Sequence, residues 1–222
     1  MPTKPRCIGI LGGTFDPVHY GHLRLAEEAA EHFQLAEVRW IPVGNPPHRA
    51  PPESDARHRL EMIRMVTGDN SKFLIDDTEV KAAKLSYTYN TLLRLRRELG
   101  SQQPLCLLLG IDTFLGLTTW YRWRELFDLT HIVVAQRPGY AMERLALIPV
   151  LYAEFEQRHS AKKNALTRKP QGSIATMTMT QLEISASAIR WMMHSGHSPR
   201  YLVPESIIDY IRKKKLYQRP NA

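Results

Sequence analysis

Two glycines and two histidines stand close together near the start of the chain, in the stretch GILGGTFDPVHYGH. Gly12 and Gly13 follow a short apolar run, and glycine lets the backbone turn sharply and approach a ligand closely. His19 and His22 are three residues apart, a spacing that puts both imidazoles on one face of a helix. The start of a helix offers unpaired N–H groups and the positive end of a dipole. These residues therefore predict a phosphate-binding site.

Better-known nucleotide motifs are absent from the sequence. It contains neither G-x-x-x-x-G-K-[ST], which argues against a P-loop enzyme, nor G-x-G-x-x-G, which argues against an NAD-dependent redox enzyme. The letters H-x-G-H recur at 194–197, but there they end a helical pattern, with Gly196 in the position of a C-cap, so we assign them no function. Asp16 and Pro17 resemble an N-cap and a first-turn proline. No third ligand has a suitable spacing for a zinc site with the histidines, so we expect no metal held by the protein.

Two further segments carry groups suited to phosphate. ISASAIR (184–190) places Ser185 or Ser187 at the start of a helix and Arg190 on its first turns. A helix N-terminus and a guanidinium both bind phosphate oxygens. GNPPHR (44–49) is a proline-stiffened loop that ends in a histidine and an arginine, and it could hold the phosphate of a second ligand.

Trp120 and Tyr121 form an aromatic pair after a predicted strand end. An indole can stack on a flat pyridinium ring through dispersion and cation–π attraction. The alternative is that both rings belong to the core.

The composition limits the classes of protein that this chain can belong to. With 222 residues, 43% of them hydrophobic, the chain can build one sizeable core. Its formal charge of +8 fits a nucleic-acid ligand, a phosphorylated substrate or a solvated basic surface. The basic runs 158–169 and 212–219 do not interleave aromatic residues with Lys and Arg as a single-strand-binding surface would, which favours the solvated surface. Cys7 and Cys106 lie in apolar runs and are expected to be buried and unpaired. No apolar run reaches the roughly 20 residues of a membrane helix, so we expect a cytoplasmic protein without a membrane partner.

Apolar runs alternate with helical patterns along the chain. We expect strands at 7–12, 38–43, 72–76, 105–110, 131–136 and 173–180, and helices at 19–34, 56–66, 88–99, 113–128, 143–157, 186–195 and 204–215. This alternation predicts an α/β fold: a Rossmann-like open parallel sheet with helices on both faces and a small C-terminal helical part. We expect a single domain over 1–222, with 184–222 as its C-terminal helical subregion. Ligands of such sheets bind beyond the carboxyl ends of the strands, where the unusual residues stand.

GGTFDPVHYGH resembles the signature of the nucleotidyltransferase superfamily that shares H-x-G-H with class I aminoacyl-tRNA synthetases. PPHR (46–49), SYT (86–88), GID (110–112), TWY (119–121), RPG (137–139) and ISASAIR extend the resemblance over nearly the whole chain. Within the superfamily the chain is similar to bacterial nicotinate-nucleotide adenylyltransferases. Members often have Asn directly after the proline that ends the second strand, whereas here Val43 and Gly44 come before Asn45.

The resemblance implies a role for each motif. The implied catalytic residues are His19, His22 and Arg190. The implied ATP-binding residues are Gly12, Gly13, Thr14, Phe15, His19, Gly21, His22, Gly110, Asp112, Ile184, Ser185, Ser187 and Arg190. The implied residues for the second substrate are Asn45, His48, Arg49, Ser86, Tyr87, Thr88, Trp120, Tyr121 and Arg137. Backbone N–H groups near Thr88 and Tyr121 are implied to receive the nicotinate carboxylate.

The implied reaction is transfer of the adenylyl group of ATP to nicotinate mononucleotide in NAD biosynthesis, with Mg²⁺ carried by ATP. One alternative is a related adenylyltransferase that acts on nicotinamide mononucleotide or phosphopantetheine. An alternative of another class is a non-catalytic basic module that binds nucleic acid. The implied partners are the two substrates, with no nucleic acid, and a homo-oligomer stays open.

Overall fold

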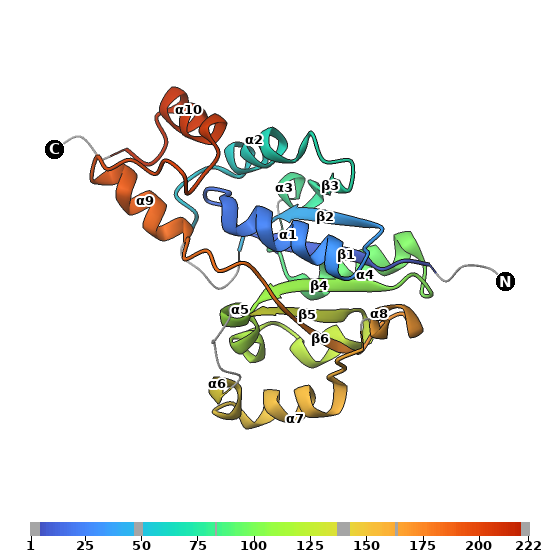
Figure 1. The fold of residues 1–222 in the computed structure, drawn as a ribbon. Helices are drawn as coiled ribbons and strands as arrows, with labels where there is room; N and C mark the ends of the chain where they lie inside the picture. Colours follow the sequence, from blue (N-terminus) through green and yellow to red (C-terminus); the bar gives the residue numbers. More distant parts are fainter. Residues whose placement is uncertain (1–4, 47–50, 83, 137–142, 163, 219–222) are drawn as a thin grey trace. The chain divides into compact units, whose positions relative to one another are not determined.

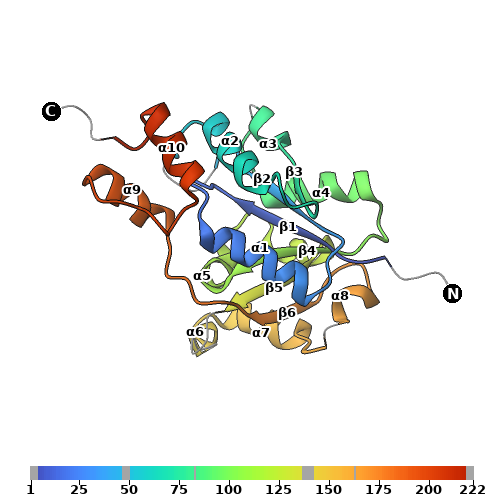
Figure 2. The same cartoon turned by 45° about the horizontal axis from the view of Figure 1, so that its top comes forward.

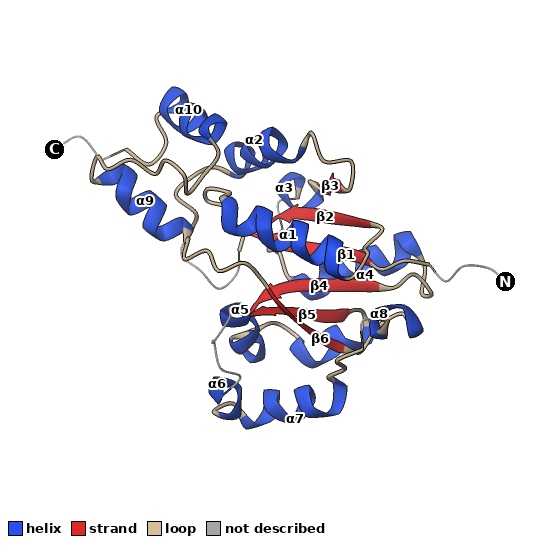
Figure 3. Ribbon diagram, viewed as in Figure 1, coloured by secondary structure: helices blue, strands red, loops and turns tan. Residues whose placement is uncertain are grey.

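The computed structural model describes residues 5–46, 51–82, 84–136, 143–162 and 164–218 (Figure 1). Six strands form one sheet in the order β3-β2-β1-β4-β5-β6, and helices accompany the sheet (Figure 3). The strands are β1 Ile8–Gly13, β2 Glu37–Pro42, β3 Phe73–Ile75, β4 Leu105–Gly110, β5 His131–Gln136 and β6 Ile174–Thr178. β1, β4, β5 and β6 pair in parallel, with Ile8 opposite Leu105 and Leu107 opposite Ile132. The predicted Rossmann-like open sheet is confirmed.

The helices match most of the predicted ones. They are α1 Tyr20–His32, α2 Ala56–Thr67, α3 Thr78–Lys81, α4 Thr88–Leu99, α5 Ile111–Leu115, η1 Leu117–Thr119, η2 Trp123–Asp128, α6 Glu143–Ala146, α7 Pro149–Arg158, α8 Ala165–Arg168, α9 Ala186–His194 and α10 Glu205–Lys214. The helical stretch expected over 113–128 is broken into α5, η1 and η2, and 143–157 is divided into α6 and α7. The four-residue helices α3 and α8 were not predicted.

Burial explains why these segments form these elements. The side chains of β4 from Leu105 to Leu109 are all buried, as expected of a strand covered on both faces. On α4, Leu92 and Leu95 are fully buried and lie on one helix face. Cys7 and Cys106 are buried and unpaired, as predicted.

The chain divides into two compact units. The first unit consists of Met1–Leu11, Leu25–Arg39 and Tyr87–Gln181, and the second of Gly12–Arg24, Trp40–Ser86 and Leu182–Ala222. In the first unit, α7 leads to a bridge between His159 and Ile174, and Figure 2 shows this helix on the β6 side of the sheet. In the second unit, α9 and α10 form the expected C-terminal helical part. A single domain over 1–222 stays a prediction. Across the described ranges no helix is both long enough and apolar enough to cross a membrane.

Candidate active site

The two histidines of the first motif lie together in the second unit. The rings of His19 and His22 stack with centroids 3.7 Å apart and planes 25° apart. The main-chain N–H of His19 donates to Nδ1 of His22 over 3.3 Å. A neutral His22 ring therefore carries its proton on Nε2, where it can be donated. The helix begins at Tyr20, so His19 precedes it and only His22 belongs to its first turn.

Both imidazoles are neutral at pH 7 in the free protein. Burial lowers the pKa of His19 to about 4. The pKa of His22 lies well below its usual range, mainly because the ring is buried and to a lesser extent because of repulsion from a charged His19. The buried Nδ1 of His19 has no hydrogen-bond partner within the described part of the chain. The pair therefore offers hydrogen bonds to an anion rather than two positive charges.

The glycines of the motif have different neighbours. The expected turn is wrong in its place, because Gly12 and Gly13 are the last two residues of β1 and neither has a positive φ. A Cβ on Gly12 would meet nothing within 4 Å, so this side of the strand end is open. A Cβ on Gly13 would stand 2.9 Å from the ring of Phe15, and one on Gly21 would stand 3.0 Å from Nδ1 of His19. The Phe15 side chain is buried, with its ring centroid 5.0 Å from that of His22. Its contribution to a ligand site is therefore limited to its main chain, while its ring supports His22.

The second phosphate motif lies beside the first within the same unit. Ser185 is the N-cap of α9, and its hydroxyl accepts a hydrogen bond from the N–H of Ala188 over 3.2 Å. The hydroxyl oxygen of Ser187, in the first turn of the helix, lies 3.3 Å from the hydroxyl oxygen of Ser185. Ile184 Cβ is 3.9 Å from the position of a Cβ on Gly21. The two motifs predicted for ATP are thus brought together.

Arg190 is held by two groups from other parts of the second unit. Its NH1 donates to the main-chain oxygen of Asp16 over 2.7 Å, and its Nε donates to the Glu53 carboxylate over 2.7 Å. The same carboxylate contacts Nε2 of His194 at 2.7 Å. The C-cap of α9 is Ser195, and Gly196 follows it with a φ of 75°, so the expected helix end at the second H-x-G-H sequence lies one residue earlier than predicted.

The loop after β2 contains the predicted second-substrate residue Asn45. The hydroxyl of Ser86 accepts hydrogen bonds from the N–H groups of Gly44 and Asn45 over 3.2 and 3.4 Å, and Ser86 N–H donates to Asn45 O over 2.9 Å. Ser86 therefore holds this loop. His48 and Arg49 lie outside the described residues, as does Arg137.

The first unit holds the other predicted binding residues. Thr88 is the first residue of α4, so its N–H has no acceptor within the helix. Tyr87 and Tyr121 pack with ring centroids 4.8 Å apart, and Trp120 is half-buried. Gly110 ends β4. Asp112 follows it on α5, exposed and 3.7 Å from NH1 of Arg144.

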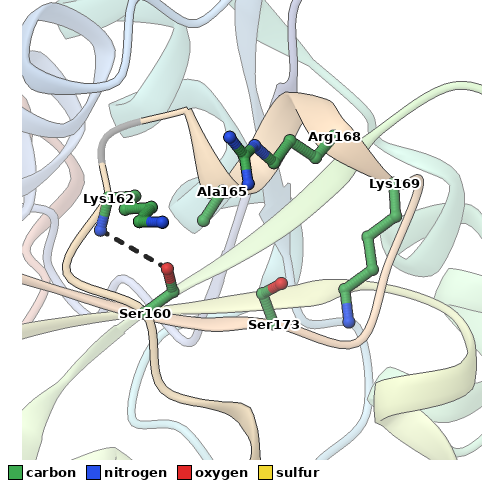
Figure 4. A pocket seen from close by; sticks show the side chains of 6 residues that line it. All are labelled: Ser160, Lys162, Ala165, Arg168, Lys169 and Ser173. Carbon is green, nitrogen blue, oxygen red and sulfur yellow. Dashed lines mark hydrogen bonds between the residues drawn. The ribbon is translucent and has the colours of Figure 1, made fainter.

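A basic cavity of about 310 Å³ in the first unit lies away from these strand ends. It is lined by Ser160, Lys162, Ala165, Arg168, Lys169 and Ser173 (Figure 4). Ser173 directly precedes β6, whereas Gly110 and Asp112 follow β4. Because these strands are parallel, the cavity lies at the opposite strand ends from Gly110 and Asp112.

Sequence reasoning missed a buried polar cluster in the second unit. Asp16 is not a helix cap, because its buried carboxylate accepts hydrogen bonds from Glu53, Ser54 and Tyr217. The sequence predicted a role for Asp16 only as a helix cap within GGTFDPVHYGH. No local pattern marks the other three residues, which reach Asp16 from distant segments.

Arg59 is a second buried charge that the sequence did not reveal. Its guanidinium donates to the carbonyls of Thr14, Gly44 and Ser54 over 2.8, 3.2 and 3.3 Å. Burial lowers the pKa of Arg59, against the raising effect of the Asp16 charge. Arg59 thus joins the segment that follows β1 to the loop after β2, and these carry residues predicted for the two substrates.

Comparison with known proteins places the chain in a family. Residues 10–192 match the cytidylyltransferase-like family model. A protein of Dechloromonas aromatica named "Probable nicotinate-nucleotide adenylyltransferase" is 51% identical over 95% of this chain and 97% of its own. A protein of the same name from Pseudomonas syringae pv. tomato is 46% identical over 100% and 98%. This chain belongs to the nicotinate-nucleotide adenylyltransferase family. It is therefore a nucleotidyltransferase.

A solved member from another organism supports the fold of this nucleotidyltransferase. Plasmodium falciparum nicotinic acid mononucleotide adenylyltransferase, complexed with NaAD, superposes with a TM-score of 0.70 at 18% identity, covering 96% of this chain and 97% of that one. At this identity the likeness concerns the fold alone. The roles of individual residues of the nucleotidyltransferase therefore stay predictions.

Proposed function

We propose that this chain transfers the adenylyl group of ATP to nicotinate mononucleotide and forms nicotinate adenine dinucleotide in NAD biosynthesis. The observation that carries the proposal is the second unit's arrangement of stacked neutral histidines beside the α9 turn and the open side of Gly12. Family membership leaves the non-catalytic nucleic-acid-binding alternative without support. We expect the enzyme to work in the cytoplasm.

The proposed step is an in-line displacement. A phosphate oxygen of the mononucleotide attacks the α-phosphorus of ATP, the bond from that phosphorus to the β-phosphate oxygen breaks, and pyrophosphate leaves with the electron pair. The attacking phosphate is already anionic, so no side chain needs to act as nucleophile or base. Catalysis then depends on positioning and on stabilising charge in the transition state.

The proposed ATP half uses three kinds of donor. His19 and His22 donate hydrogen bonds to phosphate oxygens as neutral imidazoles. Ser187 and the N–H groups of α9 receive the terminal phosphates, while the Ser185 hydroxyl caps the helix. Arg190 supplies the positive charge, and its contacts with Glu53 and Asp16 fix it before ATP arrives.

Mg²⁺ is expected to enter with ATP as part of the substrate. When bound, it supplies positive charge to the phosphate oxygens and orients the leaving pyrophosphate. Asp16 is not a suitable ligand for it, because its carboxylate is buried and both oxygens already accept hydrogen bonds from the protein.

Most residues of the proposed acceptor half lie in the first unit. Trp120 stacks on the pyridinium ring, and N–H groups near Thr88 and Tyr121 receive the carboxylate. A carboxamide matches these donors less well than a carboxylate, which gives a physical reason for preferring the acid.

The decisive experiment measures pyrophosphate release from ATP with each candidate acceptor in parallel. We expect fast release with nicotinate mononucleotide, at least tenfold slower release with nicotinamide mononucleotide, and background release with phosphopantetheine. Preference for either of the other acceptors would instead favour the related adenylyltransferase of that acceptor. No release with any acceptor would overturn the proposed function.

A further inference from the structure

Asp16 forms the buried centre of a hydrogen-bond cluster in the second unit. Its side chain is 3% exposed. Oδ2 accepts from the N–H of Glu53 over 2.9 Å, and Oδ1 accepts from the N–H of Ser54 over 3.3 Å and from the Ser54 hydroxyl. The hydroxyl of Tyr217 also donates to Oδ1, over 2.5 Å. A buried carboxylate is costly unless its oxygens are satisfied in this way.

The cluster closes a cycle around Arg190. The main chain of Glu53 donates to the Asp16 carboxylate, and the Glu53 carboxylate accepts from Nε of Arg190. NH1 of Arg190 donates to the main-chain oxygen of Asp16 over 2.7 Å, which completes the cycle. A shift of Asp16 would therefore move both groups that hold the guanidinium.

Tyr217 reaches this cycle from beyond the end of α10. Its side chain is 6% exposed, and it lies 201 positions from Asp16 along the chain. Tyr217 and Phe15 both have a φ of 52°, in the left-handed region that bulky residues rarely adopt. Such strain persists where surrounding contacts fix the residue. The pKa of Tyr217 is raised, mainly because its side chain is buried and further because of the negative charge on Asp16. Its hydroxyl therefore stays protonated and can donate at neutral pH.

We propose that Tyr217 is a positioning residue for adenylyl transfer, because its hydroxyl fixes Asp16 and thereby orients the Arg190 guanidinium. The inference rests on the proposed function, in which Arg190 stabilises the phosphates of ATP. It assigns a role in the ATP half to a residue near the C-terminal end, outside every motif that the sequence offered.

The test replaces Tyr217 by Phe, which removes the hydroxyl and keeps the ring. We expect kcat to fall about tenfold, KM for nicotinate mononucleotide to stay within twofold, and the melting temperature to fall by only a few degrees. Tyr210→Phe is the matched control, since the Tyr210 hydroxyl lies 2.8 Å from Nδ1 of His58 and removal of this bond leaves the Asp16 cluster intact. It should retain the wild-type kcat.

A double-mutant cycle with Arg190→Ala separates positioning from general loss of structure. If Tyr217 acts through Arg190, Tyr217→Phe has no further effect on kcat in the Arg190→Ala background. An equal tenfold loss in both backgrounds, or a wild-type kcat for the single variant, overturns the inference.

Two further outcomes keep the test decisive. If Tyr217→Phe does not fold, Ser54→Ala replaces it in the same cycle, because the Ser54 hydroxyl donates to the same carboxylate oxygen. If the wild-type protein releases no pyrophosphate with any acceptor, the proposed function fails. An active wild type with an unimpaired Tyr217→Phe variant contradicts only this inference.

Discussion

His22 combines a low pKa with a defined tautomer. Its Nδ1 accepts the His19 N–H, so a hydrogen bond from its ring to a phosphate must come from Nε2. Nearby phosphates would raise the pKa of the ring, so protonation and ATP binding favour each other. The free protein nevertheless presents a donor without the desolvation cost of a buried cation.

We therefore expect His22→Ala to lower kcat by about 10²–10³-fold, the usual effect of removing one donor aimed at developing charge. The fold should be retained, because His22 is half-buried at the start of α1. His197→Ala is the control, since it changes the exposed final histidine of the second H-x-G-H sequence. Wild-type turnover in a folded His22→Ala protein would remove His22 from the mechanism.

His131 gives the first unit a stability that depends on pH. Its Nε2 lies 2.9 Å from the Lys169 carbonyl and its Nδ1 accepts from Ser173 N–H over 3.0 Å, so only one neutral tautomer satisfies both contacts. Burial lowers the pKa of His131 to about 4. Between pH 6.5 and 4 the unfolded chain binds a proton that the native state does not, so stability falls as pH falls through this range.

For His131 alone the loss between pH 7.5 and 5.0 is about 2 kcal/mol. We expect urea unfolding of the His131→Gln variant to show a pH dependence smaller by that amount. The exposed His159, changed to Gln, should leave the wild-type dependence in place. An unchanged dependence in His131→Gln would mean that this ring is not kept neutral by folding.

At the scale of elements, the loop after β2 and the end of β1 use glycine for different reasons. A Cβ on Gly44 would stand 2.0 Å from the main-chain oxygen of Glu79 in α3, so this glycine allows the loop to pack on that helix. A Cβ on Gly12 would meet open space. Gly44 thus serves packing, whereas Gly12 leaves one side of the strand end uncovered.

The two alanine variants should separate these roles. Gly44→Ala should lower the free energy of unfolding by about 1–3 kcal/mol, because backbone atoms must move apart. Gly12→Ala should leave stability within about 0.5 kcal/mol and weaken ATP binding at least fivefold. Urea unfolding and calorimetric titration with ATP measure the two effects. A Gly12→Ala protein with normal ATP affinity would show that the open side of this strand end does not face the nucleotide.

The sequence predicted those elements whose signal is local. The uninterrupted apolar runs of β4 and β5 and the leucine spacing of α4 gave the observed bounds. The helices α3 and α8 have four residues each, too few to show a helical period. In the site, the pairing of His19 with His22 followed from their spacing. The roles of Asp16, Arg59 and Tyr217 did not, because side-chain contacts between distant segments leave no local pattern.

At the scale of the whole molecule, the two units carry different parts of the proposed reaction. Most residues proposed for ATP belong to the second unit, whereas Thr88, Trp120 and Tyr121 belong to the first. The positive net charge of +8 suits two phosphorylated substrates and favours their association at low ionic strength. Substitutions in the two units should therefore affect different kinetic constants.

Trp120→Ala tests this division. Loss of a stacked ring removes about 1–3 kcal/mol of binding to a flat base, so KM for nicotinate mononucleotide should rise about tenfold or more. KM for ATP should stay within twofold. The exposed Tyr152 on α7, also in the first unit, provides the control, and Tyr152→Ala should change neither constant. Initial rates at varied concentrations of each substrate give both constants. If Trp120→Ala weakened only ATP binding, the two substrates would have to be assigned to the units the other way round.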